Sequence, residues 1–165
     1  MSLPVVDDIL KQNEILCLRV ERMPVNHDQF SDLKNVPYLA VITPATHDMS
    51  PLREWWQEGN SPIQWYYNYS LKKEGIAPVT AEGNICREII YHHLSCPAMW
   101  SVFLIQDLLA MDNALRLDNP MKERINDPAD PGHQWKYRIH LSVETLLSAK
   151  TYNHSLKAMI RLAGR

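Results

Sequence analysis

The sequence predicts an α/β fold in which helices alternate with the strands of a parallel sheet. Three short apolar segments have the length of buried strands, and two of them are rich in β-branched residues: residues 15–20, 38–43 and 99–105. Segments with helical start and stop signals lie between the second and third. Strands of a parallel sheet are buried on both faces and are therefore apolar throughout, as these three are. The alternation indicates βα units.

Three helices are expected between the second and third strands. Pro51 favours a helix start because its ring fixes a helical φ, and this helix runs through Trp56. Ser61 and Gln64 have the S-x-x-Q spacing of a capping box, so a second helix starts there, with Gly75 as its stop. The remaining expected segments are a third helix over residues 80–96, an irregular stretch over 118–132, and two final helices over 142–149 and 153–162.

Length and composition are those of one globular domain. The 165 residues are 45% hydrophobic and 22% charged, and 17 basic against 19 acidic residues give a net charge of −2. That balance gives no reason to expect nucleic acid or an anionic membrane as a partner. No apolar run approaches the roughly 20 residues that span a bilayer, and the first residues are too acidic for a secretory signal. We therefore expect a cytoplasmic protein without a membrane partner.

Cysteine and histidine usage predicts neither a disulfide framework nor a metal site. Cys17, Cys86 and Cys96 are odd in number and lack C-x-x-C spacing, so we expect them to be reduced and mostly buried. His92 and His93 are adjacent, and neighbours on a helix diverge by about 100°, too far to face one ion. The five glycines form no dinucleotide-binding or P-loop pattern. The sequence therefore predicts no metal and no cofactor.

Polar residues follow each predicted strand: Glu21-Arg22, Thr46-His47-Asp48 and Gln106-Asp107. In α/β folds the functional residues lie beyond the C-terminal ends of the strands, so these residues could line one polar pocket. Ordinary solvated strand ends are the alternative. Retaining glycoside chemistry uses two carboxylates roughly 5 Å apart. Glu21, Asp48 and Asp107 are the carboxylates available, and their spacing alone does not say which of them pair.

Aromatic side chains are a second indication of a sugar site, because the apolar face of a sugar can rest on a flat ring. The candidates are Trp55, Trp56, Trp65, Tyr66, Tyr67, Trp100 and Trp135. Large aromatic side chains also dominate protein cores, and Trp65, Tyr66 and Tyr69 lie at helical spacing, so we expect these three to pack. Trp55 and Trp56 closely follow the second strand's loop, and one of the two is predicted to line the site.

Four segments, in order, resemble the bacterial amylomaltases of glycoside hydrolase family 77. LCLRVERMP at residues 16–24 is similar to the family's sixth strand, and ITPATHDMSPLREWW at 42–56 resembles its T-x-x-THD loop after the seventh strand. CPAMWSVFLIQDLLAMD at 96–112 resembles the eighth strand with its LQD segment. ERINDPADPGHQWKYRIH at 123–140 is similar to the RxNxPA…W-x-YR segment. One THD motif would be weak support, but four segments in series cover most of the chain.

The resemblance implies the C-terminal portion, about the last three βα units, of a helix-rich (β/α)8 barrel. Residues 1–165 would form a single partial domain that begins just downstream of the family's acid/base loop. In that family the nucleophilic Asp and the acid/base Glu lie on the fourth and fifth strands, upstream of the matching region. The isolated chain is thus expected to be inactive, with the N-terminal remainder of the enzyme chain as its partner. Open sheet edges also predict that it associates or aggregates.

The resemblance also implies a reaction and a site. These 4-α-glucanotransferases transfer α-1,4-glucan segments between maltooligosaccharides by a retaining, two-step mechanism, so the expected substrate is a maltooligosaccharide or α-glucan. Asp48 matches the family's third catalytic carboxylate, which holds the donor sugar and favours the cationic transition state. The residues expected to bind substrate are His47, Trp55, Gln106, Asp107, Arg124 and Asn126. Two alternatives remain: Gln106, Arg124 and Asn126 brace loops, or the chain is a non-catalytic half-barrel that binds glucan or a protein.

Overall fold

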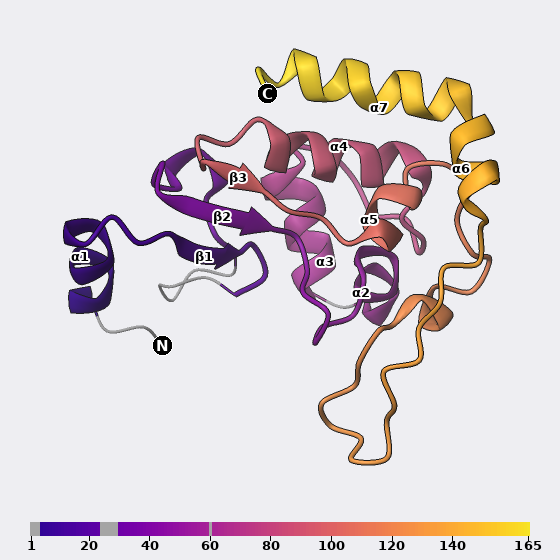
Figure 1. Cartoon of the computed structure of the whole chain (residues 1–165), viewed down its shortest axis with the longest axis horizontal. Helices are drawn as coiled ribbons and strands as arrows, with labels where there is room; N and C mark the ends of the chain where they lie inside the picture. The colour runs from indigo at the N-terminus through magenta and orange to yellow at the C-terminus, as the bar shows by residue number, and fades with distance from the viewer. Residues whose placement is uncertain (1–3, 24–29, 60) are drawn as a thin grey trace.

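The computed structural model is a helix-rich α/β structure that describes residues 4–23, 30–59 and 61–165 (Figure 1). In chain order its elements are α1 (Pro4–Gln12), β1 (Cys17–Val20), the 3-10 helix η1 (Leu33–Asn35), β2 (Ala40–Thr43), α2 (Leu52–Glu58), α3 (Ser61–Trp65), the π-helix η2 (Tyr66–Ser70), α4 (Gly83–Leu94), β3 (Trp100–Ser101), α5 (Ile105–Leu109), the 3-10 helix η3 (Pro120–Glu123), α6 (Val143–Ser148) and α7 (Lys150–Leu162). Pro24, the last residue of the segment that resembles the sixth strand, lies outside the described residues. The predicted α/β class is confirmed.

A parallel sheet in the order β1-β2-β3 forms the centre of the structure. Its register pairs Cys17 of β1 with Ala40 of β2, and Val41 of β2 with Trp100 of β3. Figure 1 shows α4 running above the sheet and α7 lying beyond α4. Because all three strands point the same way, their C-terminal ends lie at one edge of the sheet. The predicted parallel sheet is confirmed, with shorter strands than the apolar segments suggested.

The two faces of the sheet differ in burial. One face contributes to a buried cluster of Cys17, Val36, Ala40, Ile42, Cys96 and Ala98. On the other face Leu18, Val41 and Trp100 form a row across the three strands. Leu18 is 59% exposed and Trp100 is 58% exposed. Val41 between them is partly buried, so within the described part of the chain the two ends of this apolar row are exposed.

The main core lies between the helices. Trp56, Tyr66, Ile89 and Ile90 are almost fully buried in it, and Met159 of α7 packs on the same cluster. Burying each such side chain stabilises the fold by about 1.5–3 kcal/mol relative to leaving it exposed. Apolar contacts therefore hold together four helical elements: α2, η2, α4 and α7.

The third predicted strand is much shorter than expected, because residues 99–105 divide between two element types. Only Trp100 and Ser101 form β3, and the amide of Val102 adds a hydrogen bond of 2.9 Å to Ile42 O. Ile105 instead begins α5. A short apolar run fits a buried strand and a buried helix equally well, so its pattern could not locate this change.

The helix predicted from Ser61 ends earlier than Gly75. α3 continues into the π-helix η2, which ends at Ser70, and Lys72 then adopts a left-handed backbone with φ of 55°. The predicted capping role of Gln64 is wrong as well. Its side-chain amide donates to Gly75 O at 2.9 Å, and its Oε1 accepts from Ala77 N at 2.9 Å. The side chain thus holds the following loop instead of a helix start.

Other predicted boundaries shift by a few residues. Pro51 is the N-cap of α2 and not its first helical residue, and α4 begins at Gly83 instead of residue 80. Gly83 suits a close approach, because a Cβ there would meet Met111 O at 2.6 Å. The two final helices are confirmed as α6 and α7, while α1 and α5 were not predicted.

The three cysteines are free and buried, as expected. Among the described residues, no helix combines the length and the apolar content that a bilayer span requires.

Candidate active site

The loop after β2 places Asp48 at the C-terminal edge of the sheet. The Thr43 hydroxyl donates to Ala45 O at 2.6 Å, and Met49 N donates to Thr46 O at 3.1 Å. These bonds bend the chain sharply just past the strand. The Asp48 side chain remains 49% exposed. The Asp48 carboxylate is therefore accessible to a ligand, while the hydrogen bonds within its loop restrict the position of its backbone.

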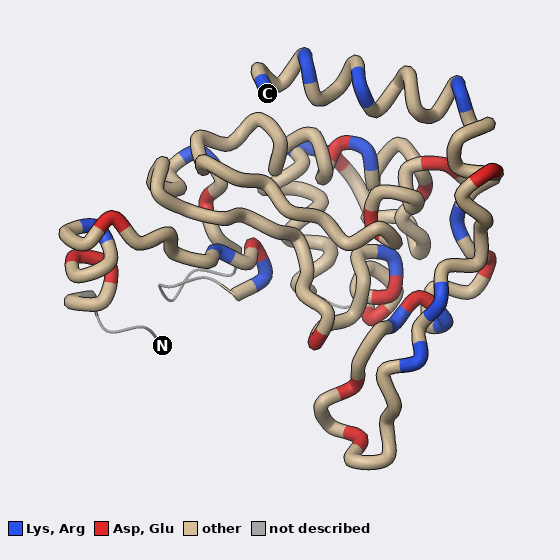
Figure 2. The backbone as a smooth tube through the Cα atoms, viewed as in Figure 1, with Lys and Arg blue, Asp and Glu red and all other residues tan. Residues whose placement is uncertain are grey.

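Two side chains hold the Asp48 carboxylate. Asn126 Nδ2 donates to Asp48 Oδ1 at 2.6 Å, and His47 Nε2 lies 3.3 Å from Asp48 Oδ2. Each carboxylate oxygen therefore has one nitrogen neighbour. Figure 2 shows both acidic and basic positions near the loop region after η3, whereas α7 carries basic positions alone. The structure thus brings together three of the predicted site residues: His47, Asp48 and Asn126.

Arg124 holds the loop that carries Asn126. Its Nε is 3.1 Å from Glu54 Oε2 of α2, and its Nη1 is 3.3 Å from Asp127 Oδ2. The neighbouring carboxylate of Glu54 raises the pKa of Arg124 above its ordinary value. With both carboxylates engaged, Arg124 fixes the start of the loop to α2, which matches the bracing alternative that the sequence left open.

Trp55 lies in an aromatic cluster on the inner side of α2 and has no described contact with Asp48. Its ring is 5.2 Å from that of Tyr66 and 5.8 Å from that of Phe30, and the Arg22 guanidinium lies 5.0 Å from its centroid. Arg22 also donates to Pro44 O at 3.1 Å and to Ser50 O at 2.7 Å. Trp55 therefore supports the arginine that ties the two ends of the Asp48 loop together.

Arg22 is a site residue that sequence reasoning recorded only as part of a polar strand end. Its guanidinium bridges Pro44 and Ser50, on either side of the Thr46-His47-Asp48 motif. The position of Arg22 directly after β1 was the available signal. Parallel neighbours end at the same edge of the sheet, so a long basic side chain there can reach the adjacent loop.

Gln106 and Asp107 are buried behind the site instead of lining it. Each is 1% exposed. Asp107 Oδ1 accepts a hydrogen bond of 2.8 Å from Leu52 N, the first free amide of α2, and Gln106 Nε2 donates to Glu123 O at 3.0 Å. Burial raises the pKa of Asp107 to about 6. The structure therefore gives both residues bracing contacts, and no described contact joins either of them to Asp48.

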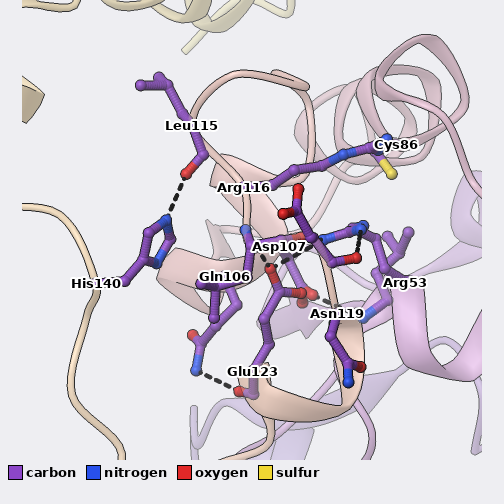
Figure 3. A network of polar contacts seen from close by, with 12 residues as sticks. Arg53, Cys86, Gln106, Asp107, Leu115, Arg116, Asn119, Glu123 and His140 are labelled. Atoms are coloured by element: carbon purple, nitrogen blue, oxygen red, sulfur yellow. Dashed lines mark hydrogen bonds and ion pairs between the residues drawn. The ribbon is translucent and has the colours of Figure 1, made fainter.

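A polar network surrounds these two residues (Figure 3). Arg53 Nη1 lies 3.1 Å from Glu123 Oε1 and 2.6 Å from Leu117 O, with Arg53 7% and Glu123 2% exposed. The network joins α2 to α5 and η3. Burial raises the pKa of Glu123 above its ordinary value, with the Arg53 charge acting in the opposite direction. This network holds in place the chain segment that leads to Arg124 and Asn126.

Glu21, the third carboxylate at the strand ends, is also buried. It is 4% exposed, accepts a hydrogen bond of 2.8 Å from the Tyr66 hydroxyl, and lies 3.5 Å from His93 Nε2. Burial raises the pKa of Glu21 to about 8 and lowers that of His93 to about 4. Of the three strand-end carboxylates, Asp48 is thus the one presented to solvent. The expected pocket with all three on its rim is not formed by the described residues.

Two cavities lie elsewhere in the molecule. One of about 860 Å³ is lined by α1, by residues near β1 including Arg19, and by the segment 31–39 that leads to β2. The second, of about 660 Å³, is lined by Glu21, Trp65 and Tyr69 among others. Asp48 lines neither of them.

The fold and the site first define a class: a parallel α/β protein with an exposed, braced carboxylate beyond the C-terminal end of its central strand. The family model of the 4-alpha-glucanotransferases matches residues 1–143. The chain belongs to this family, glycoside hydrolase family 77, as the four sequence segments predicted.

Individual relatives carry the same name. The chain is 29% identical over 161 residues to 4-alpha-glucanotransferase DPE2 of Oryza sativa subsp. japonica, covering 97% of this chain and 17% of the rice protein. It is 27% identical over 143 residues to 4-alpha-glucanotransferase of Chlamydia pneumoniae, covering 86% of this chain and 27% of that protein. The chain therefore spans between about a sixth and a quarter of these relatives' lengths.

A solved structure shares the fold. Amylomaltase from Streptococcus agalactiae in complex with acarbose superposes with a TM-score of 0.70 at 16% sequence identity, covering all of this chain and 30% of that one. At this identity the likeness establishes the fold alone.

Proposed function

We propose that this chain is the part of a 4-α-glucanotransferase that supplies its transition-state-stabilising carboxylate, Asp48. The complete enzyme would transfer α-1,4-glucan segments between maltooligosaccharides by a retaining mechanism. One observation carries the proposal: Asp48 is half exposed at the end of the central strand, with Asn126 on one oxygen and His47 on the other. That arrangement occurs in a chain that belongs to the glucanotransferase family.

The chemical argument for Asp48 is electrostatic. Retaining transfer passes through transition states with positive charge on the donor sugar. A fixed carboxylate next to that charge stabilises the transition state more than the neutral ground state, and so lowers the barrier. His47 and Asn126 leave the carboxylate partly exposed while restricting its rotation. We propose that His47 also binds a hydroxyl of the same sugar.

The nucleophile and the acid/base are proposed to come from residues beyond this chain, on the N-terminal side. Retaining chemistry needs both groups about 5 Å apart. Glu21 and Asp107 are poor candidates, because both are buried and already accept hydrogen bonds from Tyr66 and Leu52. The remainder of the enzyme would then be the chain's main partner, and the chain alone would be inactive.

We also propose that the sheet is part of a (β/α)8 barrel. The exposure of Leu18 and Trp100 on the face that they share with Val41 supports this, since a barrel encloses one face of each strand. Further barrel strands would cover this row and would pair with the open edges of β1 and β3. An enzyme of this kind would act on starch, glycogen or maltodextrin in the cytoplasm.

Among the residues predicted to bind substrate, only His47 and Asn126 contact Asp48 in the described chain. Substrate binding by Trp55, Gln106, Asp107 and Arg124 stays a prediction. Their contacts support a different role, in which they shape the site by holding its loops in place.

The test is Asp48→Asn in the full-length gene product, with glucose release from maltotriose as the assay. We expect the transfer rate to fall by about 10² to 10³ with the melting temperature unchanged, since losing one such preorganised contact has this effect. Asp118→Asn is the matched control, because Asp118 is an exposed carboxylate without a described side-chain contact. Wild-type turnover in Asp48→Asn would exclude the proposed role.

A non-catalytic half-barrel is the second candidate, and the burial of Glu21 and Asp107, which leaves Asp48 as the one strand-end carboxylate presented to solvent, favours it. It would bind glucan or a protein without turning it over. Light scattering on the isolated chain separates the two: association or aggregation agrees with a missing remainder, whereas a monomer with one sharp cooperative melt supports an independent domain.

A further inference from the structure

Trp135 contacts the site from the loop that also carries Asn126. Its ring centroid lies 4.9 Å from that of His47, at an interplanar angle of 50°. The sequence presented Trp135 as one of several aromatic residues and as the tryptophan of the W-x-YR segment. The contact joins two segments about 90 residues apart in the chain. The loop thus touches both members of the His47-Asp48 pair, one through Asn126 and the other through Trp135.

The loop that carries Trp135 is held by its own hydrogen bonds. His133 Nε2 lies 3.0 Å from Ile125 O. This contact joins the two arms of the loop, of which the first carries Asn126 and the second carries Trp135. Asp127 Oδ1 accepts from Ala129 N at 3.1 Å, which tightens the turn between the arms. Arg124 fixes the first arm to Glu54 of α2 at 3.1 Å. Asn126 and Trp135 are therefore presented to the site as one unit.

His47 needs a lateral contact if it is to keep its orientation. Its side chain is 51% exposed, and Asp48 is its one described side-chain polar partner, at 3.3 Å. The last side-chain torsion of histidine is broad, so one long contact leaves the ring free to turn its nitrogens away. The indole of Trp135, tilted by 50° to the imidazole, restricts this rotation from one side. Trp135 is itself 62% exposed, so burial of its own surface is a weak reason for its position.

We propose that Trp135 is a positioning residue that acts through His47: it holds the imidazole with Nε2 directed at Asp48 Oδ2. This inference rests on the proposed function, in which His47 and Asp48 act on the donor sugar. It assigns to the second arm of the loop a role that complements that of Asn126. One loop then holds both His47 and Asp48, the first through Trp135 and the second through Asn126.

The contact itself can be tested by NMR on the full-length gene product, and this test needs no activity measurement. The ring-proton signals of His47, assigned by their loss in His47→Gln, should lie upfield because of the indole ring current. Trp135→Ala should move them downfield, while Trp135→Phe should retain much of the shift. Gln134→Ala, a change at the exposed neighbour in the same loop, should leave them in place. Unchanged His47 signals in Trp135→Ala would overturn the proposal.

The consequence for catalysis is tested by a double-mutant cycle in the full-length gene product. We expect Trp135→Ala to lower kcat by about threefold to tenfold, as for the loss of one aromatic pair, with a smaller change in KM. In a His47→Ala background the same substitution should have little further effect. Trp135→Phe should recover most of the rate.

The outcomes of the two proposals are separable. If Asp48→Asn keeps wild-type activity, the proposed function fails, while the NMR result still decides whether Trp135 orders His47. If Asp48→Asn is inactive but the effects of Trp135→Ala and His47→Ala simply add, the function stands and the positioning role is wrong.

Discussion

Asn126 Nδ2 donates a hydrogen bond of 2.6 Å to Asp48 Oδ1, although 78 residues separate the two in the chain. Asp48 follows the central strand directly, whereas Asn126 belongs to an irregular loop far beyond the last strand. Figure 1 shows this loop projecting from the body of the molecule beside α2. Arg124 ties it there through Glu54. The Asp48 site is therefore assembled from two regions with no local relationship in sequence.

Replacing Asn126 should disturb the orientation of the Asp48 carboxylate without changing the stability of the fold. Asn126→Ala removes one exposed hydrogen bond, so we expect about a tenfold loss in kcat/KM for glucan transfer and almost no change in the melting temperature. Asn126→Asp should be more damaging, because two carboxylates would then lie within hydrogen-bonding distance and repel each other. Assays of the full-length gene product measure both. Equal activity of Asn126→Asp and the wild type would show that this contact does not matter.

The buried pair of Arg53 and Glu123 should be costly to break from one side. Arg53→Met leaves the Glu123 carboxylate, 2% exposed, without its cation, and we expect a loss of about 3–5 kcal/mol in the free energy of unfolding. Arg53→Met combined with Glu123→Leu should lose less, because no buried charge remains unpaired. Urea unfolding of the full chain gives these values. Lys122→Met, at an exposed neighbour of Glu123, is the control and should be close to wild type.

Arg165 should act as a clamp on the segment between α4 and β3. Its guanidinium donates to Leu94 O and Ala98 O at 2.6 Å, to Cys96 O at 2.8 Å and to Met99 O at 3.0 Å. We expect Arg165→Ala to lower the free energy of unfolding by about 1–3 kcal/mol. Arg165→Lys should recover only part of this, because an ammonium lacks the planar fork of five donors.

Hydrogen exchange can localise the effect of Arg165. Loss of the clamp should speed exchange of amides in residues 95–102 more than in α2. Arg161→Ala, at an exposed arginine in the last turn of α7, is the matched control. If the two arginine variants were equally stable, the clamp would contribute nothing measurable.

Glu21 should make the fold less stable as the pH rises above neutrality. Burial raises its pKa in the folded chain to about 8, from an ordinary value of 4.5. Between pH 6.5 and 8 the folded chain keeps a proton that the unfolded chain has lost, so the free energy of unfolding falls with rising pH. The slope is at most about 1.4 kcal/mol per pH unit, or about 2 kcal/mol in all.

Comparison with Glu21→Gln separates Glu21 from its neighbours. Burial lowers the pKa of His93 to about 4, so the folded chain keeps this histidine neutral, whereas in the unfolded chain it still loses a proton near pH 6.5 and opposes the Glu21 slope weakly at the start of the window. Asp107, whose pKa burial raises to about 6, is largely ionised there as well. Glu21→Gln keeps an acceptor for the Tyr66 hydroxyl and should flatten the profile in urea unfolding series at pH 6.5 and 8. A wild-type profile that rises over this window would contradict the assignment.

Local sequence patterns predicted much of the fold but not its boundaries. β1 and β2 lie within the expected apolar runs, because a buried parallel strand needs apolar residues on both faces. The strand predicted over residues 99–105 was wrong at Ile105, because α5 begins there without any change in the apolar character of the sequence. The predicted helix-capping role of Gln64 was wrong because its side chain forms hydrogen bonds with a loop 11 to 13 residues away. No local sequence pattern encodes such a contact.

The amino-acid sequence by itself determined the α/β class, the order of the main elements, the family, and Asp48 as the carboxylate that follows the central strand. Those properties depend on local periodicity and on motifs whose residues are close together in the chain. Only the tertiary structure decided which strand-end carboxylates are presented to solvent. Glu21 and Asp107 follow their strands as Asp48 does, yet both are buried by helices packed from elsewhere in the chain. Burial and long-range contacts such as those of Asn126 and Trp135 depend on how distant segments pack, and spacing along the chain does not contain that information.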